Sequence, residues 1–206
     1  MRYWSVQCLM TGSRLDSHED LLNRARAGDP AAFGELVDKV AVRLLGFLRR
    51  SAGRSAAPDA DEEDLFQTVL AHAWRLLPGF EDRGPESFYR WLVTIAKHSI
   101  NDRLKYLDAK GRGAMHTVGG DDGAWSQIAD SLTSVSRCAM RRESWERVAR
   151  ALDTLDAKHS VVVTLHLLEG LSLAEIGASL GITKNAVWER LHHGLAGLRE
   201  RLGSEV

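Results

Sequence analysis

The residues best suited to bind another molecule stand together near the C-terminus. They are Thr183, Lys184, Asn185, Trp188, Glu189, Arg190, His192 and His193. If Val187 and Leu191 face the interior of a helix, these side chains point outward. Several of them are of the types that contact phosphates and base edges in the major groove of DNA. We expect this face to bind duplex DNA. The alternative is a helical hairpin whose polar residues meet only solvent.

A helix-turn-helix pattern supplies the scaffold for that face. Ser172 and Glu175 form an S-x-x-E capping box that opens a short helix, and Gly181 can take the left-handed conformation that closes it. Thr183 is placed to cap the helix that follows. Gly177 is small at the point where the two helices must approach closely. The shared apolar core consists of Leu173, Ile176, Leu180, Ile182, Val187 and Leu191.

Two residues of this face are unusual for DNA recognition. Trp188 and Glu189 stand where lysine or serine is commoner, and packing of Trp188 against a neighbouring helix is an equal alternative. His192 and His193 are adjacent and diverge by about 100° around a helix, so they do not chelate one metal ion. We expect no metal, no cofactor and no catalytic residue. A helical hydrolase or transferase is disfavoured because the sequence has no nucleophile elbow, phosphate loop, catalytic carboxylate pair or HExxH pattern.

Helical patterns also fill the first half of the chain. One helix is predicted over residues 29–50, with Asp29 as its cap and Pro30 as its first residue. A second helix follows an acidic run at residues 59–64 and stops before Pro78. Its apolar stripe leaves a polar side made of Asp64, Gln67, Thr68, His72 and Arg75.

A third helix, starting near Ser87, carries a basic and hydrogen-bonding ridge. Its apolar face is formed by Phe88, Trp91, Leu92 and Ile95. The opposite face presents Arg90, Thr94, Lys97, His98, Asn101 and Lys105 at intervals of three and four residues. The ridge extends over about four turns. An ordinary solvated helix face is the alternative interpretation.

These patterns predict an all-α protein with two small helical domains joined by a flexible linker. Residues 1–18 form an N-terminal extension that we expect to be flexible, unless translation begins at Met10. The first domain covers residues 19–108, and the second covers 142–206 and contains the helix-turn-helix. Between them, residues 109–141 lose helical periodicity and include the run GRGAMHTVGGDDGAW.

Composition limits the class of protein. The net charge is −1, whereas a free-standing DNA-binding protein usually carries a basic surplus. Residues 58–82 carry −6 and residues 83–113 carry +4, so separate segments can contact a basic partner and DNA. No run has the length of a membrane helix, and no signal peptide is evident, so we expect a cytoplasmic protein. Cys8 and Cys138 suggest neither a disulfide framework nor a metal cluster.

Three blocks in register resemble the extracytoplasmic-function group of bacterial sigma factors. The blocks are DLFQTVLAHAWR, FYRWLVTIAKHSINDRLK and LEGLSLAEIGASLGITKNAVWERLHHGLAGLRERL, and the likeness covers residues 19–107 and 142–203. The resemblance implies a factor that binds RNA polymerase core, directs it to specific promoters and promotes transcription initiation. It assigns sigma region 2, which binds core polymerase and recognises and melts the minus-ten element, to the first domain. It assigns region 4, which reads the minus-thirty-five element, to the second. Many relatives are held inactive by an anti-sigma factor.

The resemblance also implies roles for residues of the second and third helices. By matching position, the polymerase-binding helix holds Asp64, Leu65, Phe66, Gln67, Val69, His72 and Trp74. The apolar members are equally expected in the core, so Asp64 and Gln67 are the stronger contacts. Thr68 stands where the family usually has glutamate. Contact with the non-template strand falls to Lys97, His98, Asn101, Arg103 and Lys105, which suit single-strand binding. An Asp102–Arg103 ion pair is the alternative for part of that face.

The main rival is an autonomous helix-turn-helix regulator that binds an operator without polymerase. It explains residues 142–203 but leaves the two middle blocks unexplained. The near-neutral charge fits the sigma interpretation, because a factor tethered to polymerase needs little DNA affinity of its own.

Overall fold

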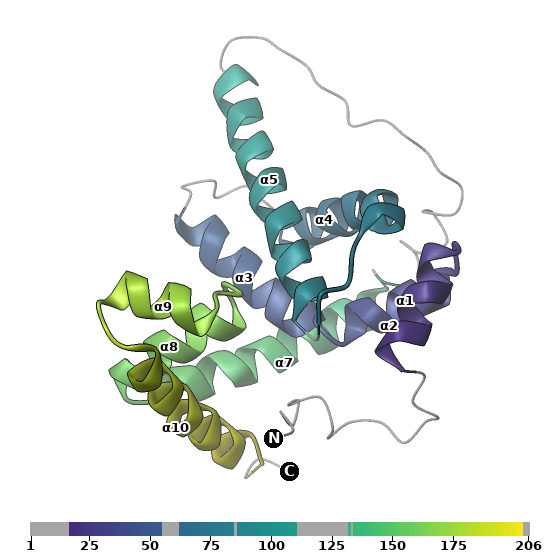
Figure 1. Ribbon diagram of the computed structural model, residues 1–206. Helices are drawn as coiled ribbons and strands as arrows, with labels where there is room; N and C mark the ends of the chain where they lie inside the picture. The colour runs from purple at the N-terminus through teal and green to yellow at the C-terminus, as the bar shows by residue number, and fades with distance from the viewer. Residues whose placement is uncertain (1–16, 55–61, 85, 111–131, 133, 204–206) are drawn as a thin grey trace.

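The computed structural model describes residues 17–54, 62–84, 86–110, 132 and 134–203 (Figure 1). The N-terminal helices are α1 (His18–Arg26), α2 (Pro30–Asp38), α3 (Ala41–Arg54), α4 (Glu62–Leu76) and α5 (Ser87–Lys110), with a 3-10 turn η2 (Leu77–Gly79) after α4. The C-terminal helices are α7 (Val135–Asp153), α8 (Ala157–Leu167), α9 (Leu173–Leu180) and α10 (Lys184–Gly203). These described ranges contain no strand, which confirms the predicted all-α class.

Helix α1 was not predicted, although its start is marked in the sequence. The hydroxyl of Ser17 accepts a hydrogen bond from the Asp20 N–H at 3.1 Å, and the Asp20 carboxylate accepts one from the Ser17 N–H at 3.3 Å. This reciprocal pair is a capping box built with aspartate in place of the usual glutamate or glutamine. The short helix buries Leu21, Leu22 and Ala25 against the rest of the domain.

The single helix predicted over residues 29–50 is wrong, because the chain turns between α2 and α3. The cap is as predicted: the Asp29 carboxylate accepts from the N–H groups that open α2. Neither glycine nor proline marks the corner. Instead, the Val40 N–H bonds to the carbonyl of Val37 at 2.9 Å, and both valines are buried. Tertiary burial of these side chains therefore ends α2 where local propensity would have continued it.

Apolar faces of α1 to α5 enclose the first core. Its largest fully buried side chains include Phe33, Phe47, Phe66, Phe88 and Tyr89. Full burial of such a side chain contributes roughly 1.5–3 kcal/mol relative to exposure. The core positions α4 and α5 side by side and leaves one face of each helix outside. Leu132, from the segment predicted as a linker, also packs into this core.

The second core lies within α7 to α10 but reaches into the first domain. Its buried members include Trp145, Leu152, Val162, Val163, Ile176, Val187 and Leu191. Leu45 of α3 belongs to the same cluster, so the two domains share apolar contacts. Among the described helices, none has the length and apolar character needed to cross a bilayer.

Most of the predicted extension and linker lies outside the described residues. Residues 1–16, 111–131 and 133 fall in that category. Within the predicted linker, residues 135–141 belong to α7, and α5 continues to Lys110. The domain limits themselves stay a prediction.

Candidate nucleic-acid interface

Local hydrogen bonds set the start and end of α9, as the sequence predicted. The Ser172 N–H donates to the Glu175 carboxylate at 2.7 Å, and the Glu175 N–H donates to the Ser172 hydroxyl at 3.2 Å. Hydrogen bonding to the Glu175 carboxylate from the side chain of Ser172 and from its backbone N–H holds the pKa of Glu175 below its usual value. Gly181 closes α9 in the left-handed conformation, with φ at 65°. The short turn that follows leads directly into α10.

Close packing fixes the orientation of α10 against α9. A Cβ atom on Gly177 would lie 2.8 Å from the carbonyl oxygen of Ile182, so only glycine fits there. The Thr183 hydroxyl caps α10 by accepting from the Ala186 N–H at 3.2 Å. Val187 and Leu191 are buried beneath the helix. The predicted helix-turn-helix is therefore present in the structure. Leu180 is a correction: it was predicted to join the shared core, but it is 36% exposed and does not belong to that cluster.

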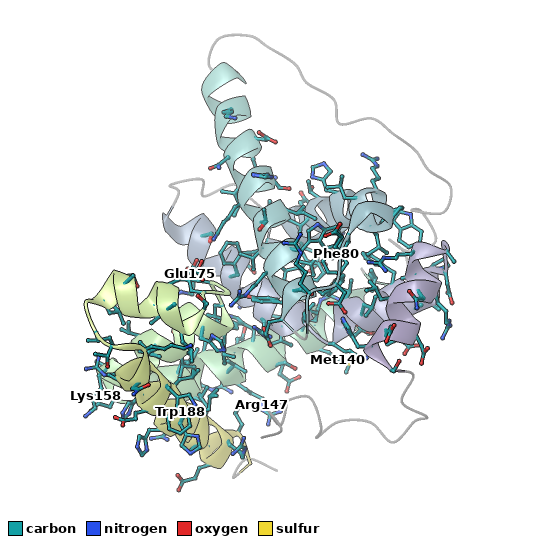
Figure 2. All side chains as sticks on the ribbon, in the orientation of Figure 1. Phe80, Met140, Arg147, Lys158, Glu175 and Trp188 are labelled. Atoms are coloured by element: carbon teal, nitrogen blue, oxygen red, sulfur yellow. The ribbon has the colours of Figure 1, made fainter. Side chains whose placement is uncertain are left out.

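The opposite side of α10 is exposed over its first three turns. Its exposed residues are Lys184, Asn185, Trp188, Glu189, His192 and His193, and Arg190 is half-buried. Trp188 points away from the core and is 50% exposed, so it does not pack into a neighbouring helix (Figure 2). Its indole stacks on the His192 ring, with centroids 5.3 Å apart and planes 11° from parallel. The outward orientation expected from the sequence is confirmed for these side chains.

The histidines of α10 do not gather into a metal site. The ring of His193 lies 5.8 Å from that of His159 on α8, centroid to centroid. Within the part of the chain that the structure describes, no group of three histidine, cysteine or acidic side chains is arranged to hold a metal ion.

The ridge on α5 is also exposed. Lys97, His98 and Asn101 face solvent, and Lys97 lies 5.8 Å from the centre of the Phe47 ring on α3. Lys105 pairs with Asp102 at 3.6 Å. Arg103 is half-buried. The exposed cations and the amide thus stand on one helix whose other face is anchored in the core.

The residues predicted to bind polymerase separate into two groups. Leu65, Phe66 and Val69 are at most 3% exposed and position α4 within the core. Asp64 is exposed, while Gln67 and His72 are half-buried. His72 lies 3.1 Å from the hydroxyl of Ser99 on α5, measured from Nδ1 to Oγ. Thr68 turns its hydroxyl back to the Asp64 carbonyl at 2.8 Å. Asp64 and Gln67 are the members of the set that a partner can reach most directly.

A buried arginine that the sequence did not predict as a site residue lies beside this face. Arg141 is 6% exposed, and its Nη2 donates to the Glu63 carboxylate at 2.9 Å. Its guanidinium also lies 4.7 Å from the centre of the Phe66 ring and donates to the carbonyl of Leu132 at 2.7 Å. No sequence signal marks this arginine, because its partners are distant in the chain and it lies in a segment without helical periodicity.

Two segments of the chain match known families. Residues 36–109 match Sigma-70 region 2, and residues 145–198 match Sigma-70 region 4. The first segment contains α4 and α5, and the second contains the helix-turn-helix with its exposed face on α10. The order of the two matches is the order predicted from the sequence.

Several relatives of similar length are sigma factors. RNA polymerase sigma factor CarQ of Myxococcus xanthus is 30% identical over 88% of this chain and 95% of the relative. ECF RNA polymerase sigma factor SigD of Mycobacterium tuberculosis is 28% identical over 96% of this chain and 88% of the relative. The solved structure of CnrH in complex with the cytosolic domain of CnrY is similar with 25% identity and a TM-score of 0.40, covering 93% of this chain and 100% of that one.

The middle blocks that an autonomous regulator leaves unexplained fall within the region 2 match, so that alternative is not favoured. The polar faces of α4, α5 and α10 lie on the segments that match regions 2 and 4. The chain therefore belongs to the extracytoplasmic-function group of RNA polymerase sigma factors, which bind the polymerase core, direct it to specific promoters and promote the initiation of transcription.

Proposed function

We propose that the two domains divide the work of promoter recognition. The first domain, residues 19–108, binds polymerase core through α4 and captures the opened minus-ten strand through α5. The second, residues 142–206, reads the duplex minus-thirty-five element through α10. The protein works in the cytoplasm, with neither a cofactor nor a catalytic step of its own. The observation that carries this proposal is the exposed polar face that α10 presents from a helix-turn-helix scaffold closed by its predicted caps.

Contact with polymerase is assigned to the polar edge of α4. Asp64 and Gln67 lie one turn apart on this helix and supply a carboxylate and an amide. The first turn of α4 is acidic, but Glu62 pairs with Arg49 and Glu63 pairs with Arg141. Asp64 is the exposed carboxylate of this turn and suits a basic surface on the enzyme. The buried Leu65, Phe66 and Val69 support this edge from beneath.

Capture of the single strand is assigned to Lys97, His98, Asn101, Arg103 and Lys105. Cations of this kind hold the sugar–phosphate backbone, and planar or amide groups bind unpaired bases. The exposure of the first three of these residues supports the assignment.

Reading of the minus-thirty-five duplex is assigned to α10 with its cap, Thr183. Lys184 and Asn185 occupy the first turn, where recognition helices contact base edges, and Arg190, His192 and His193 are placed for phosphates. Trp188 and Glu189 follow one turn later. The indole suits an apolar contact with the methyl group of thymine, and a carboxylate can accept from the amino group of cytosine.

Run-off transcription tests the proposal. Purified core polymerase is supplied with and without this chain, on DNA from upstream of its gene and on a random promoter library. Initiation that depends on the chain identifies its promoter. If the chain neither binds core nor supports initiation, yet shifts a specific duplex by itself, the autonomous regulator replaces the proposal.

Changing both Asp64 and Gln67 to alanine is expected to weaken core binding by about tenfold or more, because two polar contacts at about 1 kcal/mol each are lost. Transcription should fall at limiting concentrations of the factor and recover at high ones. The control is Leu76→Ala on the same helix, whose side chain is 55% exposed and makes no predicted contact. Equal core affinity for the double variant and the control would remove α4 from the interface.

Trp188→Ala is expected to weaken binding to the promoter while leaving the fold intact, since the indole is half-exposed. The loss should be about 1 kcal/mol, the value for burying one methyl-sized group, and it should depend on one thymine and not on neighbouring positions. Binding to duplexes in which each thymine is replaced in turn by uracil, which lacks the methyl group, locates that position. For wild type, one replacement should mimic the variant. A uniform loss at all positions would instead assign Trp188 to the backbone.

A regulatory protein is part of the proposal. The relative CnrH, 26% identical over 92% of this chain, has been solved in complex with the cytosolic domain of CnrY. We extend a partner of the anti-sigma class to this chain on the strength of its family. Coexpression with candidate neighbours, read out as loss of run-off transcription, identifies it.

A further inference from the structure

Four rings form a continuous row across the outside of α10 and the start of α8. The indole of Trp188 stacks on the imidazole of His192, with centroids 5.3 Å apart and planes 11° from parallel. The His192 ring meets that of His193 edge to face, at 6.2 Å and 73°. The His193 ring lies 5.8 Å from that of His159 on α8. The row begins where the two helices pack together and ends at Trp188, which points away from the core (Figure 2).

The inner end of this row is fixed by the packing of α8 on α10. His159 is half-buried, and its Cβ atom lies 3.4 Å from the position that a Cβ atom on Gly194 would take. Within the described residues, neither His192 nor His193 has a hydrogen-bond or ion-pair partner in the protein. Of the three ring contacts, the one between Trp188 and His192 is the closest and the nearest to parallel. It is therefore the contact that orients the indole directly.

Helical geometry explains why these two side chains stack. Residues four apart lie one above the other on the same face of a helix. Helical side chains lean toward the N-terminus of the helix, so the His192 ring reaches back toward Trp188. An exposed tryptophan without such a neighbour occupies more than one rotamer. Immobilising it on binding would cost conformational entropy, whereas a stack already present in the free protein avoids that cost.

We propose that His192 is a positioning residue for promoter recognition, which holds the Trp188 indole in the orientation that contacts one thymine methyl group of the minus-thirty-five duplex. This inference rests on the function proposed above, and it adds a residue that sets base specificity without touching a base. The phosphate contact assigned to His192 uses the nitrogens at the edge of the imidazole, whereas the stack uses its flat face. One side chain therefore serves both the DNA backbone and the orientation of the indole.

Two substitutions of His192 separate these two uses of its ring. His192→Phe keeps a flat ring for the stack and removes the nitrogens that contact a phosphate. His192→Lys keeps a donor for the phosphate and removes the ring. Each variant is assembled with core polymerase on the promoter found by run-off transcription. Its affinity is measured for that duplex with thymine, and with uracil, at the position where uracil replacement weakens wild type.

Loss of the thymine methyl group should weaken binding by wild type about fivefold. His192→Phe should keep this preference for thymine while binding both duplexes less tightly. His192→Lys and His192→Ala should bind the two duplexes with nearly equal affinity, because the indole is no longer held. His193→Ala is the matched control, since it removes the neighbouring exposed imidazole but leaves the stack on Trp188 in place. It should weaken binding to both duplexes and retain the fivefold preference.

Nuclear magnetic resonance of the free chain tests the stack without DNA or polymerase. An aromatic ring shields protons that lie above its face, so the signals of the His192 ring protons should move downfield when Trp188 is changed to leucine. The same signals should not move in the control Gly203→Ala, because nothing lies within 4 Å of a side chain there. Unchanged signals in Trp188→Leu would show that the rings do not stack in solution and would overturn the proposal.

Three results of the binding experiment also overturn it. The first is a wild-type protein for which no thymine methyl group matters. The second is a wild-type preference for thymine in His192→Lys and His192→Ala, which would leave His192 a phosphate contact alone. The third is loss of the preference in His192→Phe as complete as in His192→Ala. If no chain binds the promoter with core polymerase, the function proposed above fails, whereas the resonance experiment still decides whether His192 orients the indole.

Discussion

Replacing Gly194 by leucine is expected to lower the free energy of unfolding by about 3 kcal/mol or more and to abolish binding to the minus-thirty-five element. Helix α10 crosses α8 at this glycine. A Cβ atom there would overlap the side chain of Val163 and lie 3.4 Å from the carbonyl oxygen of His159. Val163 is fully buried and the carbonyl belongs to a helix, so neither can yield cheaply. The recognition helix α10 would no longer pack on α8 as it does in the wild-type protein.

Alanine at the same position separates two opposing effects. Gly→Ala in a helix interior gains about 0.5–1 kcal/mol of helix propensity, whereas overpacking costs about 1–3 kcal/mol. The clash should win, giving a smaller loss than leucine. Gly203→Ala, in the same helix with nothing within 4 Å, is the control and should be neutral or slightly stabilising.

Thermal unfolding followed by circular dichroism measures these differences. A loss of 3 kcal/mol corresponds to a midpoint about 6–12 °C lower for a chain of this size. Gly194→Leu with the stability of the Gly203→Ala control would mean that α10 does not pack on α8 at this point.

Features that depend on neighbouring residues were predicted well. The caps at Asp29, Ser172 and Thr183 and the left-handed Gly181 each arise from bonds to atoms within a few residues. Helix caps of this kind can be predicted from one short stretch of sequence. The outward face of α10 follows from the same local information, since the buried Val187 and Leu191 fix which side remains outside.

Features that depend on residues distant in the sequence were not predicted. The break between α2 and α3 arises from burial of Val37 and Val40 in a core built by five helices. Leu45 looks like any other apolar residue of α3, yet it belongs to the core of the second domain. For Trp188, both orientations were compatible with the sequence, and only the packing of α10 on α8 and α9 decides between them. The pattern of one sequence shows the period of a helix but not which other helices pack against it.

The candidate polymerase site combines both cases. The resemblance placed seven residues on one helix, and the helix is present as predicted. Helical spacing alone does not show which residues of a short amphipathic helix are buried in the core of its own domain and which remain available to a partner. Leu65, Phe66 and Val69 lie in the interior, so fewer residues are accessible to polymerase than the family motif contains.

Arg141→Ala is expected to destabilise the protein by about 2–3 kcal/mol. Its side chain is 7% exposed and donates both to the Glu63 carboxylate and to the Leu132 carbonyl. Removing one member of a buried pair typically costs 3–5 kcal/mol, because the remaining charge stays desolvated. We expect less here, since the Glu63 side chain is 24% exposed and water can reach it. Arg141→Met keeps the contact with Phe66 and should cost about half as much.

Arg137 provides the matched control one turn earlier on α7. It pairs with Asp38 at 3.2 Å, but the two side chains are 42% and 47% exposed, so Arg137→Ala should cost no more than about 0.5 kcal/mol. A double-mutant cycle between Glu63→Gln and Arg141→Met isolates the bridge, and we expect a coupling energy of about 1 kcal/mol or more. If Arg141→Ala were as mild as Arg137→Ala, desolvation would offset the attraction of the pair. The attachment of α7 to the first domain would then rest on Trp145 and its apolar neighbours.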